Sequence, residues 1–399
     1  MFRQSAALAR VAPSATLAIS ARAAALKREG RDIISLSVGE PDFPVPDSAR
    51  EAAIAAIRAG NNHYTAVEGT PELRAAIAEK FRRDNGLDYA PDEVIVSTGG
   101  KQVIWNALLA TLDPGDEVII PAPYWVSYPD MVMMAGGTPV VPMTTAASGY
   151  RLDPDALEAA ITPRTRWLIL NSPSNPTGAV YSAAQLAALA EVIERHPQLW
   201  VLSDDMYEHI RYTDAPFATI AAVAPALKAR TLTVNGASKA FAMTGWRIGF
   251  AGGPRPLIAA MGKAQSQSTS NPCAIAQAAT LGALSGDLAF LAERCQAFRA
   301  RRDRVVARVA GIAGLTLSPP EGAFYAYVGC EGLIGRRTPG GRLLDNDAAV
   351  AEWLLEAGVA VVHGAAFGAS PAFRISYATA PARLEAALDR IAEAVATLA

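Results

Sequence analysis

The chain has 399 residues, and its 36 basic and 38 acidic side chains give a formal net charge of −2. This balance excludes the basic surplus typical of nucleic-acid-binding proteins, and the length allows two domains with large cores. Although 51% of the residues are hydrophobic, Pro, Gly and charged residues break the apolar runs before they reach the roughly 18–20 residues of a membrane span. Cys273, Cys295 and Cys330 form no paired pattern, so we expect apolar packing roles, a reducing compartment and no metal site.

The first part of the chain alternates predicted helices and strands. The pattern predicts helices over 46–59, 71–85 and 98–112, and short strands over 94–97 and 118–120. Thr70 is a typical N-cap, Pro71 suits a first helical turn, and Gly86 follows the helix as a stop signal. This alternation favours an α/β fold with a mostly parallel sheet.

The pattern continues to Gly249 and then changes. Apolar runs over 167–170, 199–202 and 231–234 are typical of buried strands. A long amphipathic helix over 288–309 is expected to link two domains. The remaining α+β elements are predicted over 323–328, 348–356, 359–362 and 373–377, with a last helix from Pro381.

Polar motifs follow three of the apolar runs. Asn171 to Gly178 reads NSPSNPTG, 203–207 reads SDDMY, and Ser238-Lys239 follows the third run. Open α/β sheets bind ligands at the carboxyl ends of their strands, so these motifs are predicted to meet in one site. A turn at the NPTG sequence and a helix N-cap at Asp204 are the structural alternatives.

Lys239 and Arg247 together favour one cofactor class. An amine that can form a Schiff base, eight residues before a guanidinium that can hold an anion, suits an aldehyde cofactor that carries a phosphate. Pyridoxal 5'-phosphate (PLP) is that cofactor. Taken alone, the pair could equally be a solvated surface pair.

Further motifs in the same order strengthen this interpretation. They are PSAT at 13–16, SVGEPDF at 37–43, Tyr64, GTPELR at 69–74, PYW at 123–125 and FRISY at 373–377. With these motifs the chain resembles, over nearly its whole length, a fold-type I PLP-dependent aminotransferase of the aspartate aminotransferase superfamily. It is most similar to the bacterial subgroup whose members use aspartate and, in some cases, prephenate.

The resemblance implies a fold and a domain organisation. The fold is expected to be the α/β PLP-transferase fold type I, with a mostly parallel seven-stranded sheet in a large PLP-binding domain over 46–286. A smaller discontinuous α+β domain is expected over 1–45 plus 287–399, and the protein is expected to be a homodimer with shared active sites.

The resemblance also implies how the cofactor is held. Lys239 would form the Schiff base and later move the proton, and Asp204 would pair with the pyridine nitrogen. Tyr207 and Asn175 would bond the phenolic oxygen, and Trp125 would stack on the ring. Trp125 could otherwise be a core aromatic residue.

A phosphate site is implied at the start of the helix that follows the 94–97 strand. Its expected members are Gly99, Gly100, Ser238, Arg247 and Tyr64 of the partner subunit. Backbone N–H groups at a helix N-terminus suit phosphate, whereas the Walker pattern is absent. Many superfamily members carry Ser three residues before the lysine, and Gly236 stands there in this chain, which weakens the assignment of Ser238.

Substrate binding is expected to need two cations. Arg374 matches the family's α-carboxylate arginine, assisted by Asn175, Trp125 and the backbone of Gly39. Lys101 and Thr16 match the pair that recognises the distal carboxylate in the resembling subgroup. A cation in a first helical turn is unfavourable unless an anion lies near, which favours this role for Lys101 over that of a solvated lysine. The EGAFY segment over 321–325 is expected to border this pocket, and Phe324 and Tyr325 could equally be core residues.

The expected activity is a ping-pong transamination between aspartate or glutamate and a 2-oxo acid such as 2-oxoglutarate, oxaloacetate or prephenate. An aromatic aminotransferase or a PLP-dependent β-lyase is the main alternative, and it would need another group at Lys101. A PLP-sensing regulator is disfavoured because no DNA-binding domain is recognisable, and an oxidoreductase because GxGxxG is absent.

The expected partners are small amino acids and 2-oxo acids, with no nucleic acid or membrane, and the expected location is a bacterial cytoplasm. His63 and His209 are expected to have packing or surface roles.

Overall fold

The computed structural model describes residues 2–399 and contains three sheets. The strands are β1 Ile34–Ser35, β2 Val94–Ser97, β3 Glu117–Ile119, β4 Thr138–Val140, β5 Thr165–Asn171, β6 Trp200–Asp204, β7 Thr231–Gly236, β8 Gly249–Gly252, β9 Tyr325–Gly329, β10 Val359–Ala360, β11 Val362–His363 and β12 Ala372–Ser376.

The α-helices lie between these strands and at both ends of the described chain. They are α1 Ala15–Arg28, α2 Asp47–Arg58, α3 Pro71–Asn85, α4 Gly100–Thr111, α5 Ser127–Met134, α6 Pro154–Ala160, α7 Ala183–Glu194, α8 Ile220–Val223, α9 Arg255–Ser266, α10 Ala274–Ser285, α11 Phe290–Ala310, α12 Asp347–Glu356 and α13 Pro381–Ala396.

The largest sheet has seven strands in the order β2-β8-β7-β6-β5-β3-β4. Only β8 runs antiparallel to its neighbours, and the other pairs are parallel. The central strands β5, β6 and β7 are buried almost throughout, as expected for a parallel sheet covered on both faces. The predicted mostly parallel sheet is therefore confirmed.

Helix α3 shows how local sequence signals set the boundaries. The hydroxyl oxygen of Thr70 accepts a hydrogen bond from the backbone N–H of Leu73, and Pro71 occupies the first turn. Gly86 ends the helix in the left-handed region, at φ 66°. The N-cap and the stop signal lie where the sequence predicted them.

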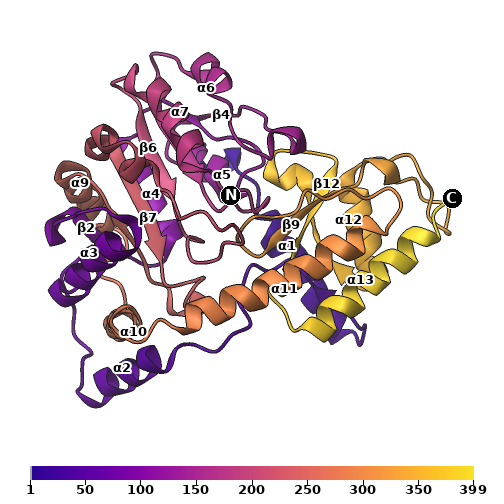
Figure 1. Ribbon diagram of the computed structural model, residues 1–399, viewed down its shortest axis with the longest axis horizontal. Coiled ribbons are helices and arrows are strands. Elements are labelled where there is room, and N and C mark those ends of the chain that lie inside the picture. The colour runs from indigo at the N-terminus through magenta and orange to yellow at the C-terminus, as the bar shows by residue number, and fades with distance from the viewer. Residues whose placement is uncertain (1) are drawn as a thin grey trace.

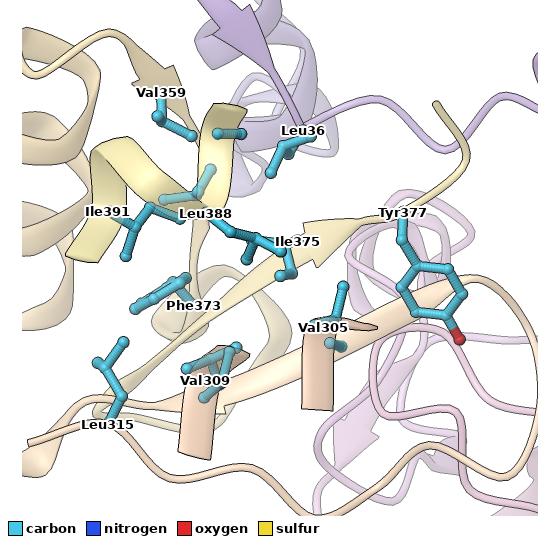
Figure 2. Close-up of a cluster of buried hydrophobic side chains, with 14 of the residues drawn as sticks. Leu36, Val305, Val309, Leu315, Val359, Phe373, Ile375, Tyr377, Leu388 and Ile391 are labelled. Atoms are coloured by element: carbon cyan, nitrogen blue, oxygen red, sulfur yellow. The ribbon is translucent and has the colours of Figure 1, made fainter. Parts of the chain in front are cut away.

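A second region is built around a three-stranded antiparallel sheet, β11-β12-β9, and the pair β1-β10. Its core takes side chains from β1, α11, β9, β12 and α13. Figure 2 shows part of this cluster, including Leu36, Val305, Phe373, Ile375 and Leu388. Figure 1 shows the long helix α11 running from the region of the seven-stranded sheet toward α12 and α13.

The pairing of β1 with β10 joins distant parts of the sequence. Ile34 lies opposite Val359, and Ser35 opposite Ala360. The N-terminal segment thus pairs with the C-terminal part of the chain. The division into 46–286 and 1–45 plus 287–399 stays a prediction.

One predicted element differs in the structure. The single element expected over 359–362 is two strands, because the chain changes sheet at Val361. Val359 and Ala360 pair with β1, whereas Val362 and His363 pair with β12. Residues 359–362 are all apolar and buried. The sequence therefore gives no sign that the chain passes from pairing with β1 to pairing with β12.

Among residues 2–399, no single helix has the length and apolar composition of a membrane span. Helices α10 and α11 meet that test only as a pair, across a bend of 89°.

Candidate active site

The carboxyl ends of β5, β6 and β7 bring the three polar motifs together. Asn171 ends β5 directly opposite Asp204, the last residue of β6. The side-chain amide of Asn171 donates to the Asp204 carbonyl over 2.8 Å, and its oxygen accepts the backbone N–H of Asn175 over 2.8 Å. Asn171 therefore fixes the loop that carries Asn175 beside the end of β6.

A cavity of about 260 Å³ opens at this edge of the sheet. Most of the predicted site residues line it. They are Thr16, Gly39, Gly100, Lys101, Trp125, Asn175, Asp204, Tyr207, Ser238, Lys239, Arg247 and Arg374.

Two predicted residues lie outside the cavity wall. Tyr64 is 90% exposed, and its role in the site of a partner subunit stays a prediction. Gly99 packs against the Arg247 side chain: a Cβ added at Gly99 would lie 2.5 Å from the guanidinium Nη2.

Lys239 presents an amine whose pKa is lowered to about 8, chiefly by burial and then by the charge of Arg374. Its Nζ donates to the carbonyl oxygen of Gly39 over 2.7 Å. A lysine with an ordinary pKa is almost fully protonated near neutrality and is neither nucleophile nor base. At pH 7 about a tenth of this amine is neutral, far more than for an ordinary lysine, and Schiff-base chemistry needs that neutral form.

Asp204 is buried, with 6% of its surface exposed. Burial raises the pKa of its carboxyl group to about 6, against two hydrogen bonds that favour the charged form. The Tyr128 hydroxyl donates to Oδ2 over 2.5 Å, and the Met206 N–H donates to Oδ1 over 3.3 Å. The carboxylate thus stays mostly ionised at neutral pH and can attract a protonated ring nitrogen.

Tyr207 and Asn175 both line the cavity and make hydrogen bonds to other lining residues. The hydroxyl groups of Tyr207 and Tyr325 lie 3.0 Å apart. The Asn175 side-chain oxygen accepts from Arg374 Nη1 over 2.9 Å. Asn175 thus connects the predicted cofactor-binding residues to the Arg374 guanidinium.

The start of α4 offers an anion cradle. Gly99 adopts φ 84° before the helix begins at Gly100, a conformation that glycine tolerates without strain. The Arg247 guanidinium lies directly against Gly99. Buried Ser238 and the N–H groups of the first helical turn complete a set of donors suited to a phosphate.

Arg374 is only 2% exposed. It donates to Asn175 and, over 2.6 Å, to the Ser37 carbonyl. Its Nε has no hydrogen-bond partner within the described chain. A buried guanidinium without a carboxylate is costly unless an anionic ligand pairs with it.

Lys101 and Thr16 also line the cavity. The Lys101 ammonium lies 4.9 Å from the centroid of the Trp125 ring. Burial and then Arg247 lower its pKa, against the charge of Asp130. The Thr16 hydroxyl oxygen is buried and has no partner in the part of the chain that the structure describes. The Lys101 ammonium and a Thr16 hydroxyl without a hydrogen-bond partner within residues 2–399 therefore both line the cavity.

Sequence reasoning missed Tyr128 and left Asn171 without a role. Tyr128 lies three residues after Trp125, at helical spacing, and holds Asp204. Tyr325, assigned only to the pocket border or the core, contacts Tyr207 and Arg374. The position of Asn171 at the end of a buried apolar run could have indicated that it lies at the site, next to Asp204.

The cavity wall has an unequal charge distribution. Lys101, Lys239, Arg247 and Arg374 line it, and Asp204 is the one carboxylate among the lining residues within 2–399. Over the same residues, none of the four cations has a carboxylate oxygen within 4.0 Å. The amine, the glycine cradle with Arg247 and the buried carboxylate fit PLP, and the other two cations suit carboxylates of a substrate.

His209 belongs to a separate buried cluster with Lys80, Asp84, Asn85 and Glu208. Its Nε2 lies 3.1 Å from Glu208 and 3.6 Å from Asp84. Although burial opposes it, the charges of Lys80 and His209 hold the pKa of Glu208 below its usual range. Asp84, Glu208 and His209 could hold a metal ion by spacing, but Lys80 pairs with Glu208 and already balances that charge.

Comparisons with known proteins agree with this geometry. The family model described as "Aminotransferase class I and II" matches residues 31–391. An aspartate/prephenate aminotransferase from Cereibacter sphaeroides is 60% identical over 385 residues, which are 96% of each chain. An aspartate aminotransferase from Rhizobium meliloti is 56% identical over 98% of this chain and 96% of its own.

Solved structures are similar as well. The crystal structure of the aspartate aminotransferase from Rhizobium meliloti superposes with a TM-score of 0.97 at 56% identity and covers 100% of both chains. The Thermus thermophilus aspartate aminotransferase with maleate gives a TM-score of 0.93 at 46% identity, covering 99% of this chain and 100% of its own. This chain therefore belongs to the aminotransferase class I and II family and has its fold and its enzyme class.

Proposed function

We propose that this protein catalyses PLP-dependent transamination between a dicarboxylic amino acid, aspartate or glutamate, and a 2-oxo acid. One observation carries the proposal. Within residues 2–399, the cavity is lined by Lys101, Lys239, Arg247 and Arg374 and by one carboxylate, Asp204. Such a wall suits three anionic groups, one phosphate and two carboxylates.

PLP, when bound, supplies an electron sink for the charge that develops at the substrate Cα. Arg247, Ser238 and the first turn of α4 would hold its phosphate, and Trp125 would cover its ring. Asp204 would hold a proton on its ring nitrogen, and Tyr207 and Asn175 would donate to its phenolic oxygen. Lys239 would anchor it.

Lys239 has a second task in the reaction. With a pKa of about 8, its amine can accept the proton from the substrate Cα and release it again near neutral pH. Burial excludes water from this transfer. The same amine thus acts as general base in one direction and as general acid in the other.

The two remaining cations set the substrate class. Arg374 binds the α-carboxylate, because its guanidinium is buried and its Nε has no hydrogen-bond partner within residues 2–399. Lys101 and Thr16, which line the same cavity, bind the distal carboxylate. Amino donor and oxo-acid acceptor use these cations in turn, which gives a ping-pong cycle.

The similar proteins support aspartate as donor and prephenate as an acceptor. The Cereibacter sphaeroides relative is named for both substrates, and the Rhizobium meliloti relative for aspartate. We infer a homodimer in which the exposed Tyr64 of one subunit completes the phosphate site of the other, in a bacterial cytoplasm. An aromatic aminotransferase is disfavoured, because the cavity would then bury Lys101 beside an apolar ligand.

The visible absorption spectrum tests the proposal. Protein purified with PLP is expected to be yellow and to bleach when aspartate is added, and prephenate is then expected to restore the colour. Bleaching without recovery by prephenate would restrict the acceptors to other oxo acids. If the protein is yellow but its spectrum does not change with aspartate, the PLP site is supported, and the assignment of Lys101 and Thr16 to the distal carboxylate is wrong.

A further inference from the structure

Tyr325 lies where several groups of the proposed site meet. It is the first residue of β9, pairs in register with Ser376 of β12, and is 1% exposed. Its side chain nevertheless lines the cavity. A fully packed phenol that reaches the ligand space from another sheet can fix the side chains around it.

The Tyr325 hydroxyl lies 3.0 Å from the hydroxyl of Tyr207. Each phenol carries one proton, so only one of the two can donate to the other. If Tyr207 donates its proton to a ligand oxygen, Tyr325 must be the donor in the pair. A hydroxyl that accepts a hydrogen bond also becomes a stronger donor, since a chain of hydrogen bonds polarises its members.

The Tyr325 ring supports Arg374. The guanidinium carbon lies 4.5 Å from the centroid of the Tyr325 ring and 5.0 Å from that of Phe367. These two rings hold the guanidinium plane, while Asn175 and the Ser37 carbonyl take its hydrogen bonds. Within the described chain, the aromatic faces are the main support of this buried charge apart from those two acceptors.

The hydroxyl also lies against the backbone of Gly39. A Cβ added at Gly39 would collide with the Tyr325 oxygen. The Gly39 carbonyl accepts the hydrogen bond from Lys239. Tyr325 thus contacts the segment that orients the amine, as well as Tyr207 and Arg374.

We propose that Tyr325 is a positioning residue with two separable parts: its hydroxyl donates to Tyr207 and directs the Tyr207 proton toward the ligand, and its ring holds Arg374 for the α-carboxylate. This inference rests on the proposed function. Substitutions that remove one part at a time can separate the two roles.

Tyr325→Phe removes the hydroxyl and keeps the ring. A phenolic oxygen on the ligand that loses hydrogen-bond support keeps its proton to a higher pH. The midpoint of the pH-dependent visible absorption change of the PLP-loaded protein is therefore expected to rise by roughly 0.4 to 1 pH unit. The KM for aspartate is expected to stay within about twofold, because the ring still covers Arg374.

Tyr325→Leu removes the ring as well. Loss of the aromatic face is expected to raise the KM for aspartate about tenfold beyond that of Tyr325→Phe, while the visible midpoint shifts as in Tyr325→Phe. Equal KM values for the Phe and Leu variants would overturn the role of the ring. If the Leu variant does not fold, the Phe variant alone decides the role of the hydroxyl.

Tyr377→Phe is a matched control. Tyr377 is also fully buried and lies 3.3 Å by its hydroxyl from that of Tyr212, outside the cavity lining. Its loss is expected to leave the midpoint and the KM unchanged.

Two failures can be told apart. If the wild-type protein gains no visible band with PLP, the proposed function fails and the inference fails with it. If the wild-type band forms and bleaches with aspartate, but Tyr325→Phe has the wild-type midpoint, the inference alone is wrong. A shift of the same size in Tyr377→Phe would also overturn it, since any buried hydroxyl would then suffice.

Discussion

Tyr128 donates its phenolic proton to the Asp204 carboxylate over 2.5 Å, and both side chains are buried. Burial raises the pKa of Asp204 to about 6, and the Tyr128 hydrogen bond acts against that rise. A neutral carboxyl group could not hold a ring nitrogen protonated. The phenol therefore keeps the carboxylate in its useful charge state near pH 7. The Tyr128 ring also meets Trp125 edge to face, with centroids 5.2 Å apart.

Tyr128→Phe is expected to raise the pKa of Asp204 by about one to two units, because a hydrogen bond to a charged group contributes about 1.5–3 kcal/mol. The dissociation constant of PLP from the protein is then expected to rise roughly two- to tenfold at pH 7, because the ionised fraction of Asp204 falls by that factor. The defect is expected to shrink at pH 8.5, where the carboxyl group ionises again. Titration of PLP-free protein with PLP at both pH values measures this.

Tyr89→Phe provides the control for that measurement. Tyr89 is buried and its hydroxyl bonds Thr233 over 3.0 Å, away from the cavity lining. An equal loss of PLP affinity in both variants, or a Tyr128→Phe defect that does not depend on pH, would mean that Tyr128 only fills space.

The contrast between Asp204 and Tyr128 shows what the sequence could reveal. Asp204 follows a buried strand, and strand ends of a parallel sheet meet at one edge, so its position was predictable. Tyr128 reaches Asp204 across 76 residues of sequence, and no local pattern records that contact. Tyr325 was ambiguous for the same reason, since its partner Tyr207 is 118 residues away.

The same limit explains the division of β10 and β11. Local signals such as the Thr70 cap and Gly86 marked α3 correctly, because they act within one helical turn. The choice of partner for Val359 or Val362 depends on strands far along the chain. The fold class and most of the cavity wall could thus be predicted, whereas a residue such as Tyr128, which orients Asp204 through a contact distant in sequence, could not.

Lys239→Ala is expected to lower turnover of aspartate at least about a thousandfold, because the variant loses both its cofactor anchor and its general base. PLP is expected to remain bound through the phosphate cradle and Asp204, but to dialyse away faster. Single-turnover kinetics and the absorbance left after dialysis measure the two effects. Lys263→Ala, at an exposed lysine of α9, is the control, and near-wild-type rates for Lys239→Ala would contradict the assignment.

Lys101→Ala is expected to raise the KM for aspartate about 10- to 100-fold, as a charge-assisted contact is lost. An amino donor without a distal carboxylate, such as alanine, is expected to lose less than about threefold. Comparing kcat/KM for the two donors measures the difference. Thr16→Val, which removes only the hydroxyl, is expected to show the same preference more weakly, and equal losses for both donors would make Lys101 structural.

Attachment of PLP to PLP-free protein is expected to depend on pH. The Lys239 amine has a pKa of about 8, so its neutral form falls about tenfold for each pH unit below that value and is nearly constant above it. The initial rate of colour formation is expected to follow this neutral fraction. A stopped-flow pH series checks it, and a rate that still climbs tenfold per unit between pH 9 and 10 would show an ordinary lysine.

A mixture of two inactive variants can test whether Tyr64 acts across a subunit interface. Tyr64 is 90% exposed and does not line the cavity of its own chain. A hybrid of Lys239→Ala and Tyr64→Ala subunits contains one site with both an intact lysine and an intact Tyr64 from the other chain. After random exchange of equal amounts, about a quarter of the wild-type activity is expected at limiting PLP, since half of the dimers are hybrids with one complete site each. Activity that never exceeds the average of the two separate variants would place Tyr64 outside the shared site.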